Sequence, residues 1–341
     1  MPEFLIPFLT GFSLSVVLLS VTLFISRRIS FVPRRESSRK HKSAVPRLGG
    51  LAIAVAFLLV VVPNGSLERS PAFLGLLVGT ALIVAFGMLD DLVPIHWTIQ
   101  LVFQAGLAVL LFFSGMRIWV VTNPFGDPYF LRPEANILPS LLVGVAFTIL
   151  VMNAMNWADG VDGLLGGVSL VAFMSIFLVS LRPEVNQPTV AILACVFAGL
   201  SLGFLIYNVP PARLLAGTSG SYFLGFGVAA LALFSGAKIA TTLLVLSVPV
   251  LDACFVIVSR IRAGLSPFHG GDERHLHDRL RQRGWSDRSI MISYTAVSAL
   301  SGFAALVLPA AGKAFFLLAL AAGFVFLVRG FGRMANMKQP V

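Results

Sequence analysis

The stretch from Ile137 to Leu181 decides the fold, and it reads ILPSLLVGVAFTILVM, then NAMNWADGVDG from Asn153 to Gly163, then LLGGVSLVAFMSIFLVSL. Two long apolar runs, of the kind that crosses a bilayer as helix, flank a polar turn. The turn carries two Asn and two Asp, which are costly to place in hydrocarbon without partners. We therefore expect the turn to face water or a polar site at a membrane edge, and function is sought there.

Composition extends this pattern to the whole chain. With 57% hydrophobic residues, 12% charged residues and a mean hydropathy of +0.91, the 341 residues are too apolar for a soluble fold. We expect an all-α polytopic membrane protein, a single integral-membrane domain over residues 1–341, with about eleven membrane helices. The expected spans are Phe4–Ile25, Leu48–Val62, Phe73–Leu89, Ile99–Met116, Ile137–Met152, Leu164–Leu181, Val190–Tyr207, Tyr222–Phe234, Ile239–Val258, Ile290–Leu308 and Ala314–Val328.

The basic residues crowd one side of this topology. Of the 25 Lys and Arg, the six on the opposite side are Arg69, Arg117, Arg132, Arg182, Lys238 and Lys313. The positive-inside rule then predicts an outside N-terminus and a cytoplasmic C-terminus. Because the basic residues lie beside apolar spans without interleaved aromatic residues, we expect anionic membrane lipids as partners of the +10 charge, and no nucleic acid.

Three polar segments fall on the predicted cytoplasmic side. Asp90 and Asp91 end the third span, where paired acids favour a bound cation or a proton to be abstracted. The Asn153–Gly163 turn offers hard oxygen ligands suited to Mg²⁺, although an ordinary turn is the alternative. The Ser266–Leu280 segment carries His and Arg side chains suited to a diphosphate, with a solvated helix or a zinc site as alternatives.

A fourth segment is the basic loop that contains His41 and Arg47. It is either a cluster that sets the membrane topology or a site that attracts a polyanionic substrate or a lipid phosphate. The sequence does not choose between these two roles.

Several motifs in a fixed order make the pattern specific. They are Pro46–Gly50 with His41, Asp90–Asp91, the Asn153–Gly163 turn, Asp252, Ser266–Phe268 and Asp272–Leu280. Together they resemble the polyprenyl-phosphate N-acetylhexosamine-1-phosphate transferase family, and within it the bacterial undecaprenyl-phosphate N-acetylglucosaminyl 1-phosphate transferases. The resemblance covers most of the chain.

The resemblance implies a bundle of ten or eleven helices in the bacterial inner membrane, with an active-site cleft on the cytoplasmic face. The implied reaction moves a sugar 1-phosphate, by default N-acetylglucosamine 1-phosphate, from a UDP-N-acetylhexosamine to undecaprenyl phosphate, and it starts cell-envelope polysaccharide synthesis. The implied cofactor is Mg²⁺, with Mn²⁺ as an alternative. A homodimer is left open.

The resemblance also assigns roles to individual residues. Catalytic roles fall on Asp90, Asp91 and Asp159. Metal-ligand roles fall on Asp90, Asp91 and Asn156. Substrate-binding roles fall on His41, Arg47, Asn153, Asp162, Arg274, His275 and His277.

Three positions depart from the family pattern. Thr218 stands where the family has a metal-binding Asp, Gln100 where Lys is common, and Asp278 where the last His of a run is usual. A neutral hydroxyl is a weaker Mg²⁺ ligand than a carboxylate, so a catalytically impaired member that binds lipid phosphate or UDP-sugar is one alternative. A transporter is another, because Asp252 lies well inside an expected span.

Overall fold

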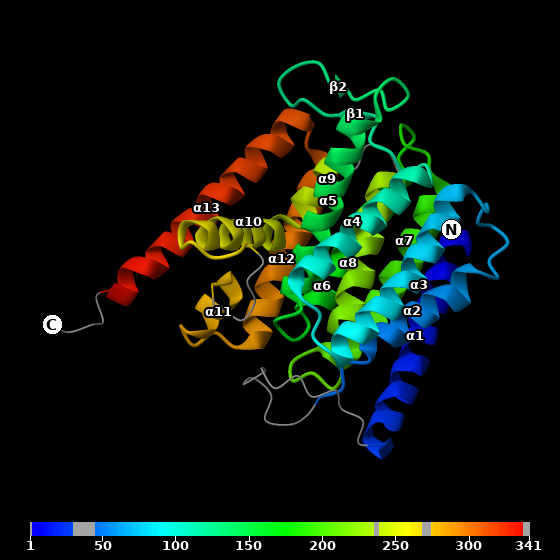
Figure 1. The fold of residues 1–341 in the computed structure, drawn as a ribbon, viewed down its shortest axis with the longest axis horizontal. Coiled ribbons are helices and arrows are strands. Elements are labelled where there is room, and N and C mark those ends of the chain that lie inside the picture. The colour runs from blue at the N-terminus through cyan, green and yellow to red at the C-terminus, as the bar shows by residue number, and fades with distance from the viewer. Residues whose placement is uncertain (1, 30–44, 235–238, 268–273, 337–341) are drawn as a thin grey trace.

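The computed structural model describes residues 2–29, 45–234, 239–267 and 274–336 (Figure 1). The helices are α1 (Pro2–Ile29), α2 (Gly49–Val61), α3 (Pro71–Leu92), α4 (Trp97–Phe113), α5 (Ile137–Ala158), α6 (Leu164–Ser180), α7 (Pro188–Asn208), α8 (Gly217–Phe234), α9 (Ile239–Val245), α10 (Ser247–Arg262), α11 (Leu276–Arg281), α12 (Asp287–Val307) and α13 (Ala310–Asn336). Strands β1 (Val120–Val121) and β2 (Tyr129–Phe130) form a small antiparallel hairpin. The all-α membrane fold is confirmed.

The long apolar helices account for a multi-pass protein. In the described ranges, seven helices are long and apolar enough to cross a membrane, and α9 with α10 would make an eighth. Helices α2, α4 and α6 are apolar but shorter, with 13, 17 and 17 residues. Each expected span coincides with a helix or with the α9–α10 pair. Eleven membrane crossings nevertheless remain a prediction, because the three short helices do not meet the length of a full span.

The ninth expected span is broken, so the prediction of one continuous helix over Ile239–Val258 is wrong. Helices α9 and α10 meet at Leu246 with an angle of 84°. Pro249 lies in the first turn of α10, where a proline ring is tolerated. In a straight helix the same ring would clash with the carbonyl of Val245 and leave it without a donor, which explains the break. The bend turns α10, and Asp252 with it, across the bundle (Figure 1).

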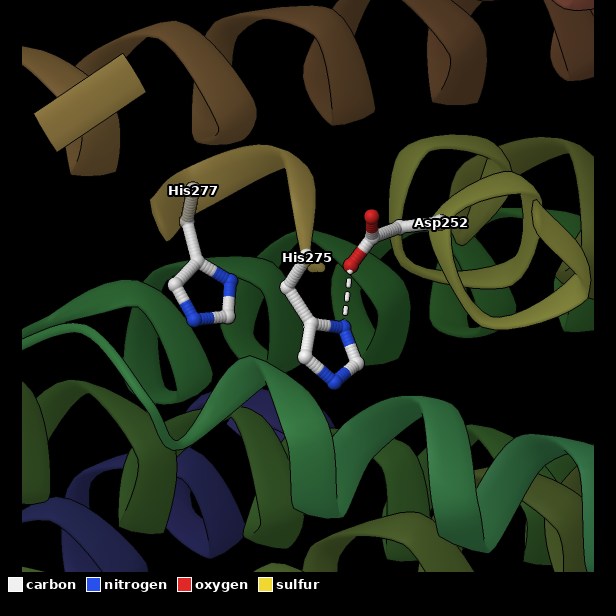
Figure 2. A group of neighbouring side chains, drawn as sticks. All are labelled: Asp252, His275 and His277. Atoms are coloured by element: carbon white, nitrogen blue, oxygen red, sulfur yellow. Dashed lines mark hydrogen bonds and ion pairs between the residues drawn. The ribbon is translucent and has the colours of Figure 1, made fainter. Parts of the chain in front are cut away.

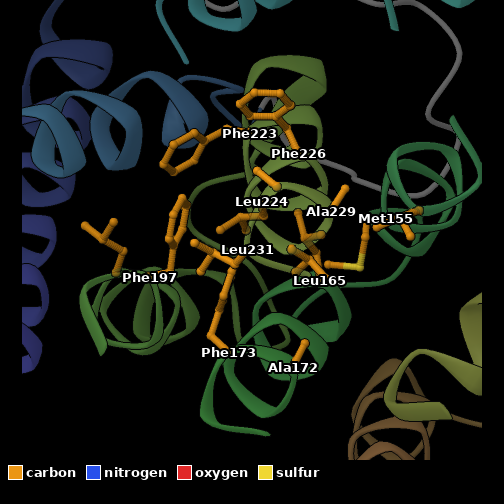
Figure 3. Close-up of a cluster of buried hydrophobic side chains, with 14 of the residues drawn as sticks. Met155, Leu165, Ala172, Phe173, Phe197, Phe223, Leu224, Phe226, Ala229 and Leu231 are labelled. Atoms are coloured by element: carbon orange, nitrogen blue, oxygen red, sulfur yellow. The ribbon is translucent and has the colours of Figure 1, made fainter. Parts of the chain in front are cut away.

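Helix α8 forms the centre of the bundle. All of its residues except Phe234 are buried, and α2, α3, α5, α6 and α7 pack around it. Figure 3 shows its aromatic and aliphatic side chains interleaved with Met155, Phe173 and Phe197. The rings of Phe173 and Phe197 stack with centroids 4.6 Å apart. A helix that is apolar on every side is expected in such a position, and it provides a fixed frame for the residues at its N-terminus.

Small residues bring α2 and α3 against the first turn of α8. A Cβ on Gly50 would lie 2.1 Å from the backbone nitrogen of Gly220, and a Cβ on Gly87 would lie 2.3 Å from the Cα of Ser219. Such distances leave no room for a side chain, so these helices meet backbone to backbone. The close approach sets Asp90 and Asp91, one turn after Gly87, beside the N-terminus of α8.

Candidate active site

Asp91 caps the N-terminus of α8 from a neighbouring helix. Its Oδ1 accepts the backbone N–H of Thr218 at 2.9 Å, and its Oδ2 accepts the N–H of Ser219 at 3.3 Å and the Ser219 hydroxyl at 3.1 Å. The first N–H groups of a helix have no partner within the helix, and the N-terminus carries partial positive charge. The carboxylate therefore meets a positive environment although only 6% of the residue is exposed.

Asp90 shares its two oxygens among neutral donors. Its Oδ1 accepts the backbone N–H of Ile95 at 2.8 Å and the Gln100 amide at 2.9 Å, while its Oδ2 accepts the Thr218 hydroxyl at 2.6 Å. The Gln100 carbonyl oxygen in turn accepts the Tyr222 hydroxyl at 2.9 Å. Gln100 and Thr218, two of the three positions that depart from the family pattern, thus bind opposite oxygens of one carboxylate. Each supplies a hydrogen bond where the family pattern has a charge.

The approach of Arg47 to this cluster depends on a glycine. Gly217, the first residue of α8, has φ of +70°, in the left-handed region that favours glycine. A Cβ at this position would lie 2.6 Å from Asp91 Oδ2 and 2.8 Å from the Arg47 carbonyl oxygen. The Pro46 carbonyl, next to Arg47, accepts the N–H of Leu215 at 2.9 Å. The loop before α2 is thereby fixed against the loop before α8.

The Asp159–Gly163 turn is fixed by the segment that follows α7. Gly163 has φ of +77°, and its N–H donates to the Asn208 side-chain oxygen at 2.8 Å. Asp162 Oδ2 accepts the N–H of Ala212 at 2.9 Å. The turn predicted over Asn153–Gly163 is shorter than expected, because Asn153 to Ala158 continue helix α5 and only Asp159 to Gly163 form the turn. Asp162 holds this turn to the segment after α7 through its carboxylate.

The two Asn residues that the sequence placed in the turn lie in the last turns of α5, and they have different partners. The Asn156 side-chain oxygen accepts the Ser221 hydroxyl at 2.8 Å, which links α5 to the first turn of α8. The Asn153 amide donates to the Gln104 side-chain oxygen at 2.6 Å and to the Ile149 carbonyl at 2.8 Å. Asn156 thus adjoins the Asp90–Asp91 cluster, whereas Asn153 connects α5 to α4.

Asp159 is the acid whose titration this environment changes most clearly. Part of the residue stays accessible, but its carboxyl lies among protein atoms, and the loss of solvation raises its pKa to about 8. Arg47 opposes this shift, while the negative charges of Asp91 and Asp162 add to the rise in pKa. Three carboxylates, Asp91, Asp159 and Asp162, thus act on one another beside Arg47, and such a group of acids is a setting that favours a bound cation.

The histidine segment forms a second polar cluster (Figure 2). The Nδ1 atom of His275 lies 2.8 Å from Asp252 Oδ2, and the backbone N–H of Leu276 donates to Asp252 Oδ1 at 2.7 Å. The rings of His275 and His277 are nearly parallel, 8° apart, with centroids 5.3 Å apart. One ligand atom from each of Asp252, His275 and His277 lies within 4.8 Å of the others, and all three residues are buried.

The two clusters meet at the end of α5. The Trp157 ring lies 5.3 Å from the His275 ring, and the Arg260 guanidinium lies 5.5 Å above the Trp157 ring. A Cβ added to Gly160 would lie 2.8 Å from His277 Nε2, so the histidine segment contacts the acidic turn closely. Residues more than a hundred positions apart are joined into one site, on the side of the bundle opposite the β hairpin (Figure 1).

The predicted site residues fall into three groups. The structure brings together Asp90, Asp91, Asn156, Asp159, Asp162 and Arg47, and it adds His275 and His277 through Trp157 and Gly160. Arg274 donates to the backbone and hydroxyl oxygens of Ser259 at 3.0 Å, which anchors it to α10. His41 lies outside the described residues, as do Phe268 and Asp272.

Several residues of the site were missed as site residues by the sequence reasoning. They are Asn208, Ser219, Ser221, Tyr222 and the partnership of Asp252 with His275. Asp252 carried a usable signal, because a carboxylate inside an apolar helix requires a partner. Asn208 carried a weaker one, as an amide at the end of an apolar helix. The other three carry hydroxyl groups whose partners come from distant segments.

Comparison with known proteins identifies the family. The sequence profile described as glycosyl transferase family 4 matches residues 73–236. A Bacillus subtilis (strain 168) protein described as a probable undecaprenyl-phosphate N-acetylglucosaminyl 1-phosphate transferase is 27% identical over 91% of this chain and 86% of its own length. A Mycobacterium tuberculosis (strain ATCC 25618 / H37Rv) decaprenyl-phosphate N-acetylglucosaminephosphotransferase is 31% identical over 79% of this chain and 73% of its own length.

A third relative comes from Thermotoga maritima and is described as an undecaprenyl-phosphate alpha-N-acetylglucosaminyl 1-phosphate transferase. It is 29% identical over 85% of this chain and 87% of its own length. The chain belongs to glycosyl transferase family 4, the polyprenyl-phosphate sugar-1-phosphate transferases that its motifs resemble.

Proposed function

We propose that this membrane protein transfers N-acetylglucosamine 1-phosphate from a UDP-sugar to undecaprenyl phosphate. An oxygen of the lipid phosphate attacks the β-phosphorus of the donor, the bond from that phosphorus to the bridging oxygen breaks, and UMP leaves. The product is a lipid diphosphate sugar that starts a cell-envelope polysaccharide. Transferases of phosphoryl groups work chiefly by positioning and by neutralising charge, which is the chemistry that the polar clusters offer.

The observation that carries the proposal is the joining of the acidic and histidine clusters. Acids bind a metal that neutralises a diphosphate, while imidazole and guanidinium groups bind the diphosphate itself. His277 lies against Gly160 of the Asp159–Gly163 turn, and His275 lies against Trp157 at the end of α5, so one substrate is able to reach both clusters. A nucleotide-sugar that spans the two clusters explains why both belong to one site.

The acidic cluster fits Mg²⁺ by its donor chemistry. Asp90, Asp91 and Asn156 all present oxygen atoms, and each oxygen accepts at most two protein hydrogen bonds from the described residues. Burial raises the pKa of Asp159, and the nearby charges of Asp91 and Asp162 add to this rise. We assign Asp90, Asp91 and Asn156 as the residues that would hold Mg²⁺, or Mn²⁺ in its place. When bound, the ion would neutralise the diphosphate oxygens.

The remaining assignments follow from charge and position. Asp90 and Asp91 would orient the attacking lipid phosphate, and Asp159, with a pKa of about 8, suits a group that exchanges a proton near neutral pH. His275, His277 and Arg47 would bind the diphosphate, and Asp162 and Asn153 would shape the nucleotide site. Arg274, which is hydrogen-bonded to Ser259, would also bind the substrate. His41 is kept as a substrate-binding candidate from the sequence alone.

The second candidate function is binding without turnover, and Thr218 motivates it. Its hydroxyl donates to Asp90 at 2.6 Å and so occupies an oxygen assigned to the metal. A neutral hydroxyl adds no charge to the metal site. An impaired member would bind UDP-sugar or lipid phosphate and release no UMP.

The topology extends the proposal to the cell. We place the protein in the bacterial inner membrane, with the N-terminus outside and the active site and C-terminus in the cytoplasm, where UDP-sugars are found. This orientation rests on the asymmetry of Lys and Arg. Membrane lipids are the expected surroundings, and a homodimer remains open.

The deciding experiment measures transfer from radiolabelled UDP-N-acetylglucosamine to undecaprenyl phosphate by the purified protein with Mg²⁺. We expect labelled lipid and stoichiometric UMP, both lost when Mg²⁺ and Mn²⁺ are chelated. Binding of the nucleotide-sugar with no UMP would establish the second candidate. Absence of both binding and product with this donor would overturn the assignment of N-acetylglucosamine, and other UDP-N-acetylhexosamines would then be assayed in the same way.

A further inference from the structure

Asp252 is a buried acid to which the proposed chemistry gives no role. It lies on α10 with 5% of its surface exposed, and each of its oxygens accepts a different donor from the start of α11. The donors are His275 Nδ1 at 2.8 Å and the backbone N–H of Leu276 at 2.7 Å. One carboxylate therefore fixes both the ring of His275 and the backbone that carries it.

The contact determines which ring nitrogen remains for the substrate. Because Nδ1 donates to Asp252, Nε2 lies on the side of the ring away from that acid (Figure 2). The same ring lies 5.3 Å from Trp157, at the end of α5 beside the acidic turn. A histidine with one nitrogen held by a carboxylate keeps a fixed orientation and offers the other nitrogen to a ligand.

We propose that Asp252 is the positioning residue of His275 and holds its ring as an imidazolium whose Nε2–H donates to a phosphate oxygen of the sugar donor. This inference rests on the proposed transferase function. An imidazolium and a carboxylate form a neutral pair, so burying them together costs less than burying either charge alone. Both nitrogens of the charged ring are donors, which matches an acid on one side and a phosphate on the other.

The two-donor contact requires a carboxylate at this position. An Asn side chain has one acceptor oxygen, so it satisfies either the ring or the Leu276 N–H and turns its NH₂ group against the other. A Glu side chain keeps both acceptors but adds a methylene, which displaces the ring. Asp252→Asn therefore removes the positioning with almost no change in volume, and Asp252→Glu tests whether a displaced carboxylate restores part of it.

A metal ion at Asp252, His275 and His277 is the competing explanation. The ligand atoms are close enough, within 4.8 Å of one another. However, both oxygens of Asp252 already accept protein donors, and the two imidazole rings stack in parallel at 5.3 Å. This arrangement serves a hydrogen-bonded acid and base better than a shared metal ligand set.

The first test is a double-mutant cycle on transfer kinetics with Asp252→Asn, His275→Gln and both together. We expect each single variant to lower kcat/KM by about 10- to 100-fold, as for residues that orient a ligand-binding His. If Asp252 acts through His275, the double variant is no worse than His275→Gln. Losses that multiply in the double variant, or an Asp252→Asn protein as active as wild type, would overturn the inference. Asp127→Asn, in the β1–β2 loop, is the control carboxylate.

The second test needs no turnover, so it separates this inference from the proposed function. Trp157 emission reports on the adjacent imidazolium, which quenches an indole. We expect Asp252→Asn and His275→Gln to raise the emission by the same amount, and Trp157→Phe to abolish the difference. Equal emission in all three Trp157-containing proteins would contradict the charged ring.

The metal alternative is tested in the same protein without substrate. The measurement is the number of Zn²⁺ or Mn²⁺ ions bound per protein. One ion that binds to wild type and is lost in Asp252→Asn would overturn the acid–histidine pair in favour of a metal site. A wild-type protein that transfers no sugar phosphate but shows the emission changes would refute the proposed function and keep the pair.

Discussion

Asp90 and Asp252 are both buried acids with both oxygens hydrogen-bonded, but the nature of their partners differs. The side-chain partners of Asp90 are the neutral Gln100 and Thr218, whereas Asp252 binds an imidazole ring that is able to carry the opposite charge. Hydrogen bonds alone satisfy the geometry of Asp90 without balancing its charge. The side-chain partners of Asp90 bring no charge of their own, whereas the partner of Asp252 is a ring that is able to become a cation. This difference supports the proposal that Mg²⁺ binds at Asp90 and Asp91 rather than at Asp252.

The largest effect is expected from a substitution in the acidic cluster itself. Asp91→Asn replaces a carboxylate that accepts three donors from the start of α8, and it removes one charge from the cation site. We expect transfer activity to fall by about 100- to 1,000-fold, the range seen when an electrostatic group is lost. Radiolabel transfer at saturating Mg²⁺ measures this. Activity close to that of the wild-type protein would show that the cation binds at another site.

The junction of the two clusters is the next target. In Gly160→Ala the new methyl group would lie 2.8 Å from His277 Nε2, so the histidine ring has to move away from the acidic turn. We expect a loss of about tenfold in kcat/KM, because small displacements of substrate-binding groups are costly. Gly106→Ala on α4 is the matched control, since a Cβ there has no neighbour within 4 Å. Equal behaviour of the two variants would show that the junction is not needed for transfer.

The neutral environment of Asp90 predicts that Gln100 and Thr218 are energetically coupled. Thr218→Asp sets a second acid against Asp90 Oδ2 and should lower the stability of the Mg²⁺-free protein. Gln100→Lys sets a cation at Oδ1 and should restore it. A double-mutant cycle of thermal unfolding is expected to give a coupling of about 1 kcal/mol. Additive effects of the two substitutions on stability would show that Asp90 does not couple positions 100 and 218.

The last prediction concerns Asp159 and pH. Its pKa is about 8 in the folded protein and near 3.8 when unfolded, so the folded state holds a proton that the unfolded state releases. Stability from this group is fully present below pH 4 and is lost as pH rises toward 8. Asp159→Asn should flatten this dependence, seen as an unfolding temperature that falls less between pH 5 and pH 8 in Mg²⁺-free detergent. Parallel curves for both proteins would contradict the raised pKa.

The sequence predicted the helices more completely than the contacts between them. Long apolar runs specify membrane helices through composition alone, which is why each expected span matches a helix or the α9–α10 pair. The 84° break before Pro249 was missed, because the apolar run continues through it. The motifs located the acidic turn and the histidine segment. Their pairings, such as Asp252 with His275 and Thr218 with Asp90, join distant segments and cannot be read from spacing.

Helix α8 also has a consequence for how the protein is made. Among the long apolar helices of the described chain it has the lowest mean hydropathy, 1.3. Even so, 94% of its apolar stretch is buried inside the protein, against 11% for α13. It gains less than the others from contact with lipid, and five of the helices that pack against it, α2, α3, α5, α6 and α7, are translated earlier, whereas α9 follows it. During synthesis α8 thus enters a site that its predecessors have already built, and the start of α8 joins the acids of α3 at that step.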